Sequence, residues 1–197
     1  PALLTSRRFW GYALAAGLSS GSFFAYLGGA PFVGDQVFGL SPALLGVLFG
    51  APAIGYFLGN FASGRFSTRF GVNRMVLWGA LFNASGIGLN VALFRLGFGS
   101  PLVFFGLMTF MGLGNGMVIP NATAGALSIR PDLAGTASGL SGAMMIGFGA
   151  ALSALAGTLL TPGSGALTLL WIMFATAVAA VITISLVIRR ERRLALV

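Results

Sequence analysis

Six apolar runs, each close to the length of a membrane-spanning helix, follow one another along this chain of 197 residues. A transmembrane helix needs about 20 mostly apolar residues. Only 7% of the residues are charged, whereas a soluble domain has roughly a quarter, so the chain cannot cover itself with a water-facing surface. We therefore predict an all-α membrane protein with six transmembrane helices in one bundle at 9–188. The predicted helices are 9–30, 42–62, 75–94, 101–120, 133–160 and 167–188.

The eleven basic residues are all arginine, and their distribution predicts an orientation. Ten of them lie on one side of the predicted spans, at 7–8, 65–74, 130 and 189–193, and only Arg95 lies on the other. Because arginine accumulates in cytoplasmic loops, we expect both ends of this segment to be cytoplasmic, including a basic tail at 189–197. A net charge of +8 also suits nucleic acid, but arginines at span ends meet anionic lipid, so we expect no nucleic-acid partner.

Histidine and cysteine are both absent from the chain. This removes the commonest metal ligand, the commonest general base and the thiolate nucleophile. The predicted spans also contain no lysine, arginine or carboxylate, although proton relays and ion sites in membranes are built from such groups. We therefore predict no enzymatic activity, no metal site, no cofactor and no ion-coupling site within these spans.

Prolines and polar residues mark the expected helix ends. Ser41 and Ser100 each precede a proline, which is typical of an N-cap followed by proline at the first helical position. We expect Asp132 to cap the fifth helix. Prolines are expected to kink the second helix at Pro52 and to end the first and fourth helices at Pro31 and Pro120.

Four of the six predicted helices carry a one-sided stripe of aromatic, methionine and small polar residues. Polar groups are costly in hydrocarbon, and methionine and aromatic walls adapt to varied apolar ligands. We expect the four stripes to share a substrate cavity, although interhelical packing explains any single stripe equally well. The helices at 75–94 and 167–188 are bulkier and aliphatic, as lipid-facing helices are. The candidate cavity residues are Tyr12, Ser19, Phe23, Tyr26, Tyr56, Asn60, Met108, Met111, Asn115, Ser138, Ser141 and Met145.

Glycine is unusually frequent, with 31 residues. Small residues let helix backbones approach one another closely in a membrane. The fifth helix has the clearest series, with Gly135, Gly139, Gly142 and Gly147. Two interpretations remain open for this helix: ordinary close packing, or a flexible helix that lines a cavity.

A basic segment, SGRFSTRFGVNR at 63–74, separates the second and third predicted helices. It resembles the motif G-x-L-x-D-R-x-G-x-[KR]-[KR] of the major facilitator superfamily, which lies between the second and third helices and recurs in degraded form between the eighth and ninth. The glycines and arginines match at Gly64, Arg69, Gly71 and Arg74. A threonine at 68 and an asparagine at 73 replace an acid and a base, as is typical of the second copy.

Two longer stretches, 20–50 and 120–144, are similar to the carboxy-terminal half of the Bcr/CflA drug-resistance branch of that superfamily. The matching strings are PFV at 31–33, FGLS at 38–41, PNA at 120–122 and AGTAS at 134–138. The similarity extends over nearly the whole chain.

This resemblance implies one half of a major facilitator fold, made of two inverted three-helix repeats, with 1–8 ending the central cytoplasmic loop. It implies the carboxy-terminal half of a proton-coupled multidrug efflux transporter of the inner (plasma) membrane, working by alternating access. The expected partners are an amino-terminal six-helix half that would precede this chain, the lipid bilayer, small amphipathic drug-like substrates and protons. Family members carry their coupling carboxylates mainly in the amino-terminal half, in agreement with the uncharged spans here.

The resemblance also makes the basic segment a candidate gating motif. We expect Gly64 and Gly71 to provide a tight turn and a close approach to a neighbouring helix. Arg69 or Arg74 is then expected to reach the carbonyl end of a helix or Asp132, and so to hold the cytoplasmic gate in one state.

Two other functions are compatible with the sequence. The first is half of a metabolite facilitator or symporter, which is disfavoured because the stripes offer few paired amides or charges for a sugar or an amino acid. The second is a non-transporting six-helix scaffold that associates through its glycine faces.

Overall fold

The computed structural model describes residues 3–161, 163 and 165–194, and over those residues the chain is helical with no strand. Residues 195–197 of the predicted basic tail, and 1–2, lie outside the described residues. The elements are α1 (Arg7–Phe32), the π-helical turn η1 (Val33–Val37), α2 (Pro42–Phe49), α3 (Ala51–Phe70), α4 (Val72–Arg95), α5 (Pro101–Leu127), the 3₁₀ turn η2 (Pro131–Leu133), α6 (Ala134–Leu159) and α7 (Gly165–Leu194).

Five stretches of the described chain are long and apolar enough to cross a membrane. The second predicted span is one of them and consists of α2 and α3 together. The sixth long helix, α1, has 26 residues but falls short in hydropathy, because serines, glycines and tyrosines interrupt its sequence. This composition suits its position, since α1 packs against α5, α6 and α7 and presents few side chains to lipid. The stretches are Pro42–Phe70, Val72–Arg95, Pro101–Leu127, Pro131–Leu159 and Gly165–Arg193.

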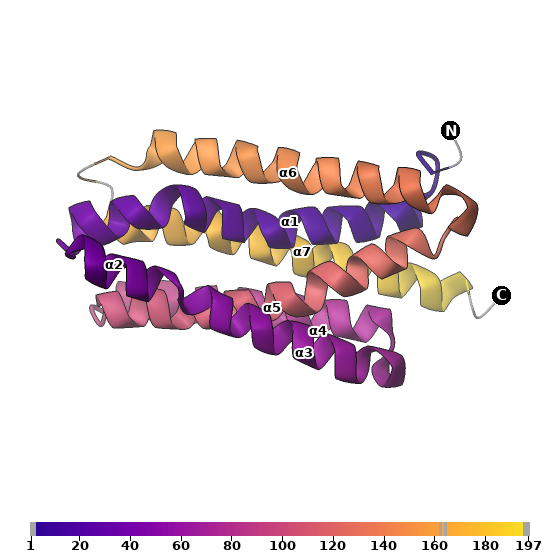
Figure 1. Ribbon diagram of the computed structural model, residues 1–197, viewed down its shortest axis with the longest axis horizontal. Coiled ribbons are helices and arrows are strands. Elements are labelled where there is room, and N and C mark those ends of the chain that lie inside the picture. Colours follow the sequence, from indigo (N-terminus) through magenta and orange to yellow (C-terminus); the bar gives the residue numbers. More distant parts are fainter. Residues whose placement is uncertain (1–2, 162, 164, 195–197) are drawn as a thin grey trace.

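The helices form a bundle in which α1 begins and α7 ends at the same end (Figure 1). The ends of α3 and α5 and the starts of α4 and α6 lie at that end too, so ten of the eleven arginines gather there. We refer to it as the arginine-rich end. Arg95 is at the opposite end, where its guanidinium lies 5.8 Å from the ring centroid of Trp171.

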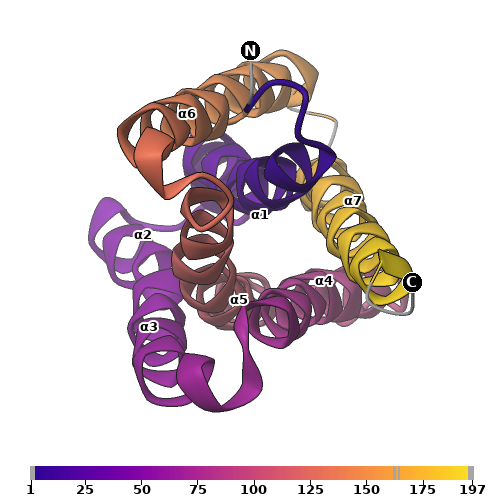
Figure 2. The same ribbon diagram turned by 90° about the vertical axis from the view of Figure 1, so that its right-hand side faces the viewer.

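The packing partners of α1 and α5 reveal the internal repeat. Helix α1, which opens the first three-helix unit, packs mainly against α6 and α7 of the second unit. Helix α5, which opens the second unit and runs in the opposite direction, packs mainly against α3 and α4 of the first (Figures 1 and 2). This reciprocal exchange is the arrangement that two inverted three-helix repeats produce.

The serine caps were predicted correctly. The Ser41 hydroxyl accepts the Leu44 N–H at 3.4 Å, and the Ser100 hydroxyl accepts the Val103 N–H at 3.2 Å. The capping role expected of Asp132 was wrong, because α6 begins after η2 without a side-chain cap and the Asp132 carboxylate faces Arg130 instead.

The expectation that Pro120 ends its helix was also wrong, and a neighbouring helix explains why. Proline has no N–H for the carbonyl four residues earlier, which is that of Gly116. The Ser63 hydroxyl of α3 donates to this carbonyl at 3.0 Å, and the Asn121 amide bonds both Ser63 and the Met117 carbonyl. Helix α5 therefore continues to Leu127. Pro31 likewise lies inside α1 rather than beyond its end.

Pro52 breaks the second span, as its sequence predicts. Helix α2 ends at Phe49, Gly50 forms the joint, and Pro52 lies in the first turn of α3. The Ala53 N–H donates a hydrogen bond to the Gly50 carbonyl at 2.9 Å. The Phe49 carbonyl accepts a hydrogen bond from the Tyr26 hydroxyl of α1 at 2.8 Å.

Close glycine packing occurs between α3 and α5 rather than along α6. A Cβ on Gly55 would lie 1.8 Å from the Thr109 carbonyl oxygen, and a Cβ on Gly112 would lie 1.9 Å from that of Pro52. Only glycine allows the two backbones to approach this closely. Each of the four α6 glycines at 135, 139, 142 and 147 has open space where a Cβ would be, so close packing within this bundle does not explain them.

Candidate functional site

An apolar cavity of about 450 Å³ opens beside the break between α2 and α3. Its walls come from α1, α2, α3, α5 and α6, and α4 and α7 lie on the other side of the bundle (Figure 2). Five predicted cavity residues line it, and they come from all four striped helices: Phe23, Tyr26, Tyr56, Asn115 and Met145.

Three stacked aromatic rings form one wall of the cavity. The Tyr26 ring lies 4.9 Å from Phe49 at an interplanar angle of 15°, and 6.5 Å from Phe23 at 23°. We call Phe23, Tyr26 and Phe49 the aromatic stack. The hydrogen bond from Tyr26 to the Phe49 carbonyl fixes this stack to the end of α2. Flat faces of this kind suit planar or apolar ligands.

A buried hydrogen-bond network lies behind the cavity and connects α1, α4 and α5. The Asn83 amide donates to the Ser22 hydroxyl at 3.1 Å and to Ser19 at 3.4 Å. The Ser19 hydroxyl donates to Asn115 Oδ1 at 2.6 Å. We call Ser19, Ser22, Asn83 and Asn115 the serine–asparagine network. Asn83 is fully buried, so α4 also contributes a polar inner face.

Asn115 is the member of this network that reaches the cavity. Its side chain is 2% exposed, and its Nδ2 makes no hydrogen bond within the described part of the chain. A buried amide donor without a partner costs free energy. The cavity wall therefore contains a buried donor that is unused, in mostly apolar surroundings.

The other seven predicted cavity residues do not line this cavity, so the expectation of one shared site for all twelve was too broad. Met108 and Met111 are fully buried in the hydrophobic core between helices. Asn60 bonds the Tyr56 carbonyl of its own helix, and Ser138 is exposed. The remaining three are Ser19 in the serine–asparagine network, Ser141, which is buried with no partner among the described residues, and Tyr12 near the arginine-rich end.

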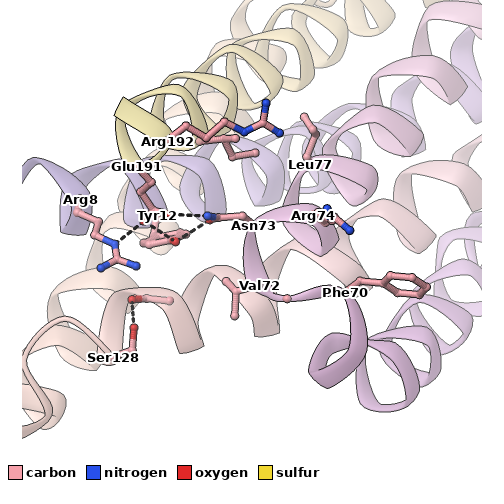
Figure 3. A pocket seen from close by; sticks show the side chains of 13 residues that line it. Arg8, Tyr12, Phe70, Val72, Asn73, Arg74, Leu77, Ser128, Glu191 and Arg192 are labelled. Atoms are coloured by element: carbon pink, nitrogen blue, oxygen red, sulfur yellow. Dashed lines mark hydrogen bonds and ion pairs between the residues drawn. The ribbon is translucent and has the colours of Figure 1, made fainter. Parts of the chain in front are cut away.

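A second cavity, of about 570 Å³, lies at the arginine-rich end and contains a polar cluster (Figure 3). Glu191 of α7 forms an ion pair with Arg8 of α1 and accepts a hydrogen bond from the Asn73 amide of α4. The Tyr12 hydroxyl donates to Asn73 Oδ1 at 2.6 Å and lies 3.2 Å from a Glu191 oxygen. We call Arg8, Tyr12, Asn73 and Glu191 the end cluster.

The end cluster joins the ends of three helices. In Figure 3 its four side chains point toward one another from α1, α4 and α7, whereas Arg74 lies apart. The Tyr12 ring fits over Gly125 of α5, where a Cβ would lie 2.9 Å from the ring. Of these four residues, only Tyr12 is a site residue predicted from the sequence. The available signals were Glu191, the single acid among the arginines at 189–193, and Asn73, the residue at which the motif is degenerate.

The basic segment is helical almost throughout, and only one of its two glycines forms the expected tight turn. Gly71 alone forms the turn between α3 and α4, with φ of +81°. Gly64 lies inside α3, and neither glycine has an atom within 4 Å of a built Cβ, so the expected close approach was wrong. Glycine is required at Gly71 because its backbone adopts a conformation that side chains disfavour.

The expected contact between this segment and Asp132 is not formed. Asp132 pairs with Arg130, two residues away, at 2.8 Å, and these hydrogen bonds raise the pKa of Arg130 above its ordinary value. Arg69 lies over the ring of the adjacent Phe70, 5.4 Å from its centroid. Among the described residues, neither Arg69 nor Arg74 forms an ion pair. The contact from this segment to another helix end is made by Asn73.

Comparisons with known proteins agree with this architecture. The family model of the Major Facilitator Superfamily matches residues 4–196. The chain is 34% identical over 179 residues to the uncharacterized MFS-type transporter YdgK of Bacillus subtilis, covering 89% of this chain and 43% of YdgK. It is 31% identical over 147 residues to the bicyclomycin resistance protein homolog of Haemophilus influenzae, covering 74% of this chain and 36% of that protein. No solved structure matches the chain.

The fold and the cavity define a multi-pass membrane bundle of the kind found in transporters. The chain belongs to the Major Facilitator Superfamily. It spans less than half the length of the two relatives, and its helices correspond to one half of the superfamily fold.

Proposed function

We propose that this chain is the carboxy-terminal half of a proton-coupled multidrug efflux transporter that works by alternating access in the inner (plasma) membrane. The observation that carries the proposal is the apolar cavity beside the break in the second span. It has an aromatic stack on one wall and no charged lining residue. Such a wall suits amphipathic compounds of varied shape better than a sugar or an amino acid, which needs several paired polar groups.

The degenerate basic segment supports assignment to the carboxy-terminal half. Threonine at 68 and asparagine at 73 are typical of the second copy of the superfamily motif. One relative is named as a bicyclomycin resistance homolog, which fits an export function. In this proposal the arginine-rich end is cytoplasmic, as the positive-inside rule favours.

The proposal assigns the rest of the substrate site to the amino-terminal half. The cavity is lined by α1, α2, α3, α5 and α6, the helices on the side of the bundle away from α4 and α7. Helix α6 offers an open face of small residues on its outer surface, where the partner half would pack. Proton-coupling carboxylates would be supplied by that half, since the six spans predicted from the sequence contain none.

The end cluster would let this half move as one body during alternating access. It fixes α1, α4 and α7 to one another at the proposed cytoplasmic face. Gly71 and Asn73 provide the link from the basic segment, with Arg69 and Arg74 left to meet lipid headgroups or the partner half. Rigid-body rocking of two halves is the usual form of such a transport cycle.

Transport by the complete protein in inside-out membrane vesicles tests the proposal. Tetraphenylphosphonium and ethidium should accumulate in the vesicles when a proton gradient is imposed, and nigericin, which collapses the gradient, should abolish accumulation. Vesicles without the protein provide the baseline.

The other outcomes separate the alternatives. Gradient-independent movement of sugars or amino acids would indicate a metabolite facilitator. Failure to move any solute, together with stable self-association in detergent, would indicate a scaffold and contradict the proposal.

A further inference from the structure

The amide nitrogen of Asn115 is a buried hydrogen-bond donor without a partner at the wall of an apolar cavity. Asn115 lies on α5, one of the two helices at the centre of the bundle, and is 2% exposed. Its Nδ2 has no acceptor within the described residues, although its Oδ1 is paired. This buried polar group of the cavity wall is left unsatisfied by the packing of the bundle itself, whereas Tyr56, whose hydroxyl also has no hydrogen bond among the described residues, is an exposed residue.

The serine–asparagine network determines which end of the amide is free. Asn83 donates to Ser19, and Ser19 in turn donates to Asn115 Oδ1 at 2.6 Å. Because each hydroxyl has a single proton, this chain of donors leaves Oδ1 as the acceptor and Nδ2 as the remaining donor. Asn83 and Ser19 are both fully buried, so solvent does not compete for these bonds.

The surroundings of the donor define the ligand group that would satisfy it. Asn115 shares the cavity with the aromatic stack, and none of the residues that line the cavity is a carboxylate or an arginine. A neutral oxygen acceptor on an aromatic or apolar molecule satisfies the donor without bringing an unpaired charge into the membrane interior.

We propose that Asn115 is a specificity-determining residue, whose Nδ2–H donates to a carbonyl or other neutral oxygen of a substrate lying against the aromatic stack. This assignment rests on the proposed drug-efflux function and adds the substrate class: neutral or weakly polar aromatic compounds with an oxygen acceptor. Ser19 acts as a positioning residue, because its hydroxyl holds Oδ1 and turns Nδ2 away from the network.

Two probes that differ in their acceptors test the assignment in the complete protein. Chloramphenicol is a neutral aromatic compound with an amide carbonyl, and tetraphenylphosphonium is an aromatic cation without a hydrogen-bond acceptor. Equilibrium binding to purified protein in detergent and transport into vesicles are measured for both. Asn115→Leu keeps the branched shape and the number of side-chain heavy atoms of asparagine but removes the donor.

For Asn115→Leu, the Kd and KM for chloramphenicol should rise about tenfold, which is the effect of one lost hydrogen bond. The values for tetraphenylphosphonium should stay within about twofold. Ser19→Ala keeps the donor but loses its positioning, so chloramphenicol binding should weaken by about threefold with tetraphenylphosphonium again unchanged. Gln36→Leu removes an exposed carboxamide outside the cavity and should alter neither probe.

Equal weakening for both probes would overturn the assignment, since it would show a structural role. Unchanged binding of chloramphenicol would overturn it as well. If Asn115→Leu does not fold, the Ser19→Ala protein decides between these outcomes. A rise in the Kd for chloramphenicol without a rise in the Kd for tetraphenylphosphonium would support the assignment, and any other result would overturn it. Unmodified protein that binds tetraphenylphosphonium but not chloramphenicol overturns this inference alone, whereas protein that moves neither probe overturns the proposed function together with it.

Discussion

The end cluster and the cavity both lie against α1, but the polar groups are paired in the end cluster, whereas the cavity contains an unpaired donor. At the arginine-rich end, Arg8, Tyr12, Asn73 and Glu191 satisfy one another across three helices. In the cavity, the lining is mostly aromatic and aliphatic, and the Asn115 donor has no partner among the described residues.

This difference separates a structural site from a ligand-binding site. A fully paired polar cluster favours one arrangement of its helices, because any movement breaks several bonds at once. An apolar wall with a buried unpaired donor gains from a molecule that fills it. Changes in the end cluster should therefore affect stability and all substrates equally, whereas changes in the cavity should affect substrates selectively.

The largest effect is expected where the cavity wall depends on backbone contact. Gly112→Leu would place side-chain atoms inside the backbone of α3, since even a Cβ there lies 1.9 Å from the Pro52 carbonyl oxygen. The cost exceeds the roughly 1–3 kcal/mol typical of an overpacked core. We expect no folded protein by size-exclusion chromatography in detergent. Gly106→Leu, on the same helix with open space at its Cβ, is the control and should fold normally.

Glu191→Gln should produce the next largest effect, of a different kind. It removes the charge opposite Arg8 and weakens the bonds to Asn73 and Tyr12. Because Arg8 is half exposed, solvent screens its ion pair, and most of a loss of about 2 kcal/mol comes from the hydrogen bonds to the carboxylate. The melting temperature of the purified protein should fall.

Transport by the Glu191→Gln protein should fall in the same proportion for chloramphenicol and tetraphenylphosphonium. Arg193→Gln, an exposed change at the same helix end, should leave both the melting temperature and transport unchanged. A change in the ratio of the two substrates would contradict the division between the two regions.

Replacing each of the two glycines of the basic segment by alanine should change the free energy of unfolding in opposite directions. Gly71→Ala places a side chain at φ of +81°, which costs about 1.5 kcal/mol. Gly64→Ala lies inside α3 with open space around it and should stabilise the helix by about 0.5–1 kcal/mol. Thermal unfolding of the two variants measures both effects. Destabilisation of the Gly64→Ala protein would contradict the open space at this position and would indicate a close approach of a neighbouring helix.

The sequence predicted the helices more reliably than their ends. Apolar runs define spans because a bilayer requires about 20 apolar residues wherever they occur. Pro120 does not end α5 because Ser63, 57 residues earlier in the chain, supplies the missing donor to the Gly116 carbonyl. No local pattern contains that information, since it depends on which helices become neighbours.

The same limit applies to the sites. Helical spacing correctly placed Phe23 and Tyr26 of α1 on one cavity wall, because residues three apart share a helix face. It did not separate them from Tyr12, which belongs to the end cluster a few turns away. Asn73 and Glu191 are 118 residues apart in sequence, and only the packing of α4 beside α7 brings them together.

Tyr26→Phe should give the smallest effect and the sharpest test of the cavity wall. It keeps the aromatic stack but removes the hydrogen bond to the Phe49 carbonyl, at a cost of about 1 kcal/mol. Because Pro52 interrupts the helix next to this carbonyl, α2 has few other ties to α1, and its backbone should open more often. Hydrogen exchange measured by mass spectrometry should become faster in Pro42–Phe49 and remain unchanged in α4.

Tyr56→Phe is the control, because it removes a hydroxyl that has no hydrogen bond among the described residues, although Tyr56 lines the same cavity. It should leave exchange in α2 as it is, so equal exchange in both variants would show that packing of the rings, rather than the hydrogen bond, holds α2 against the cavity.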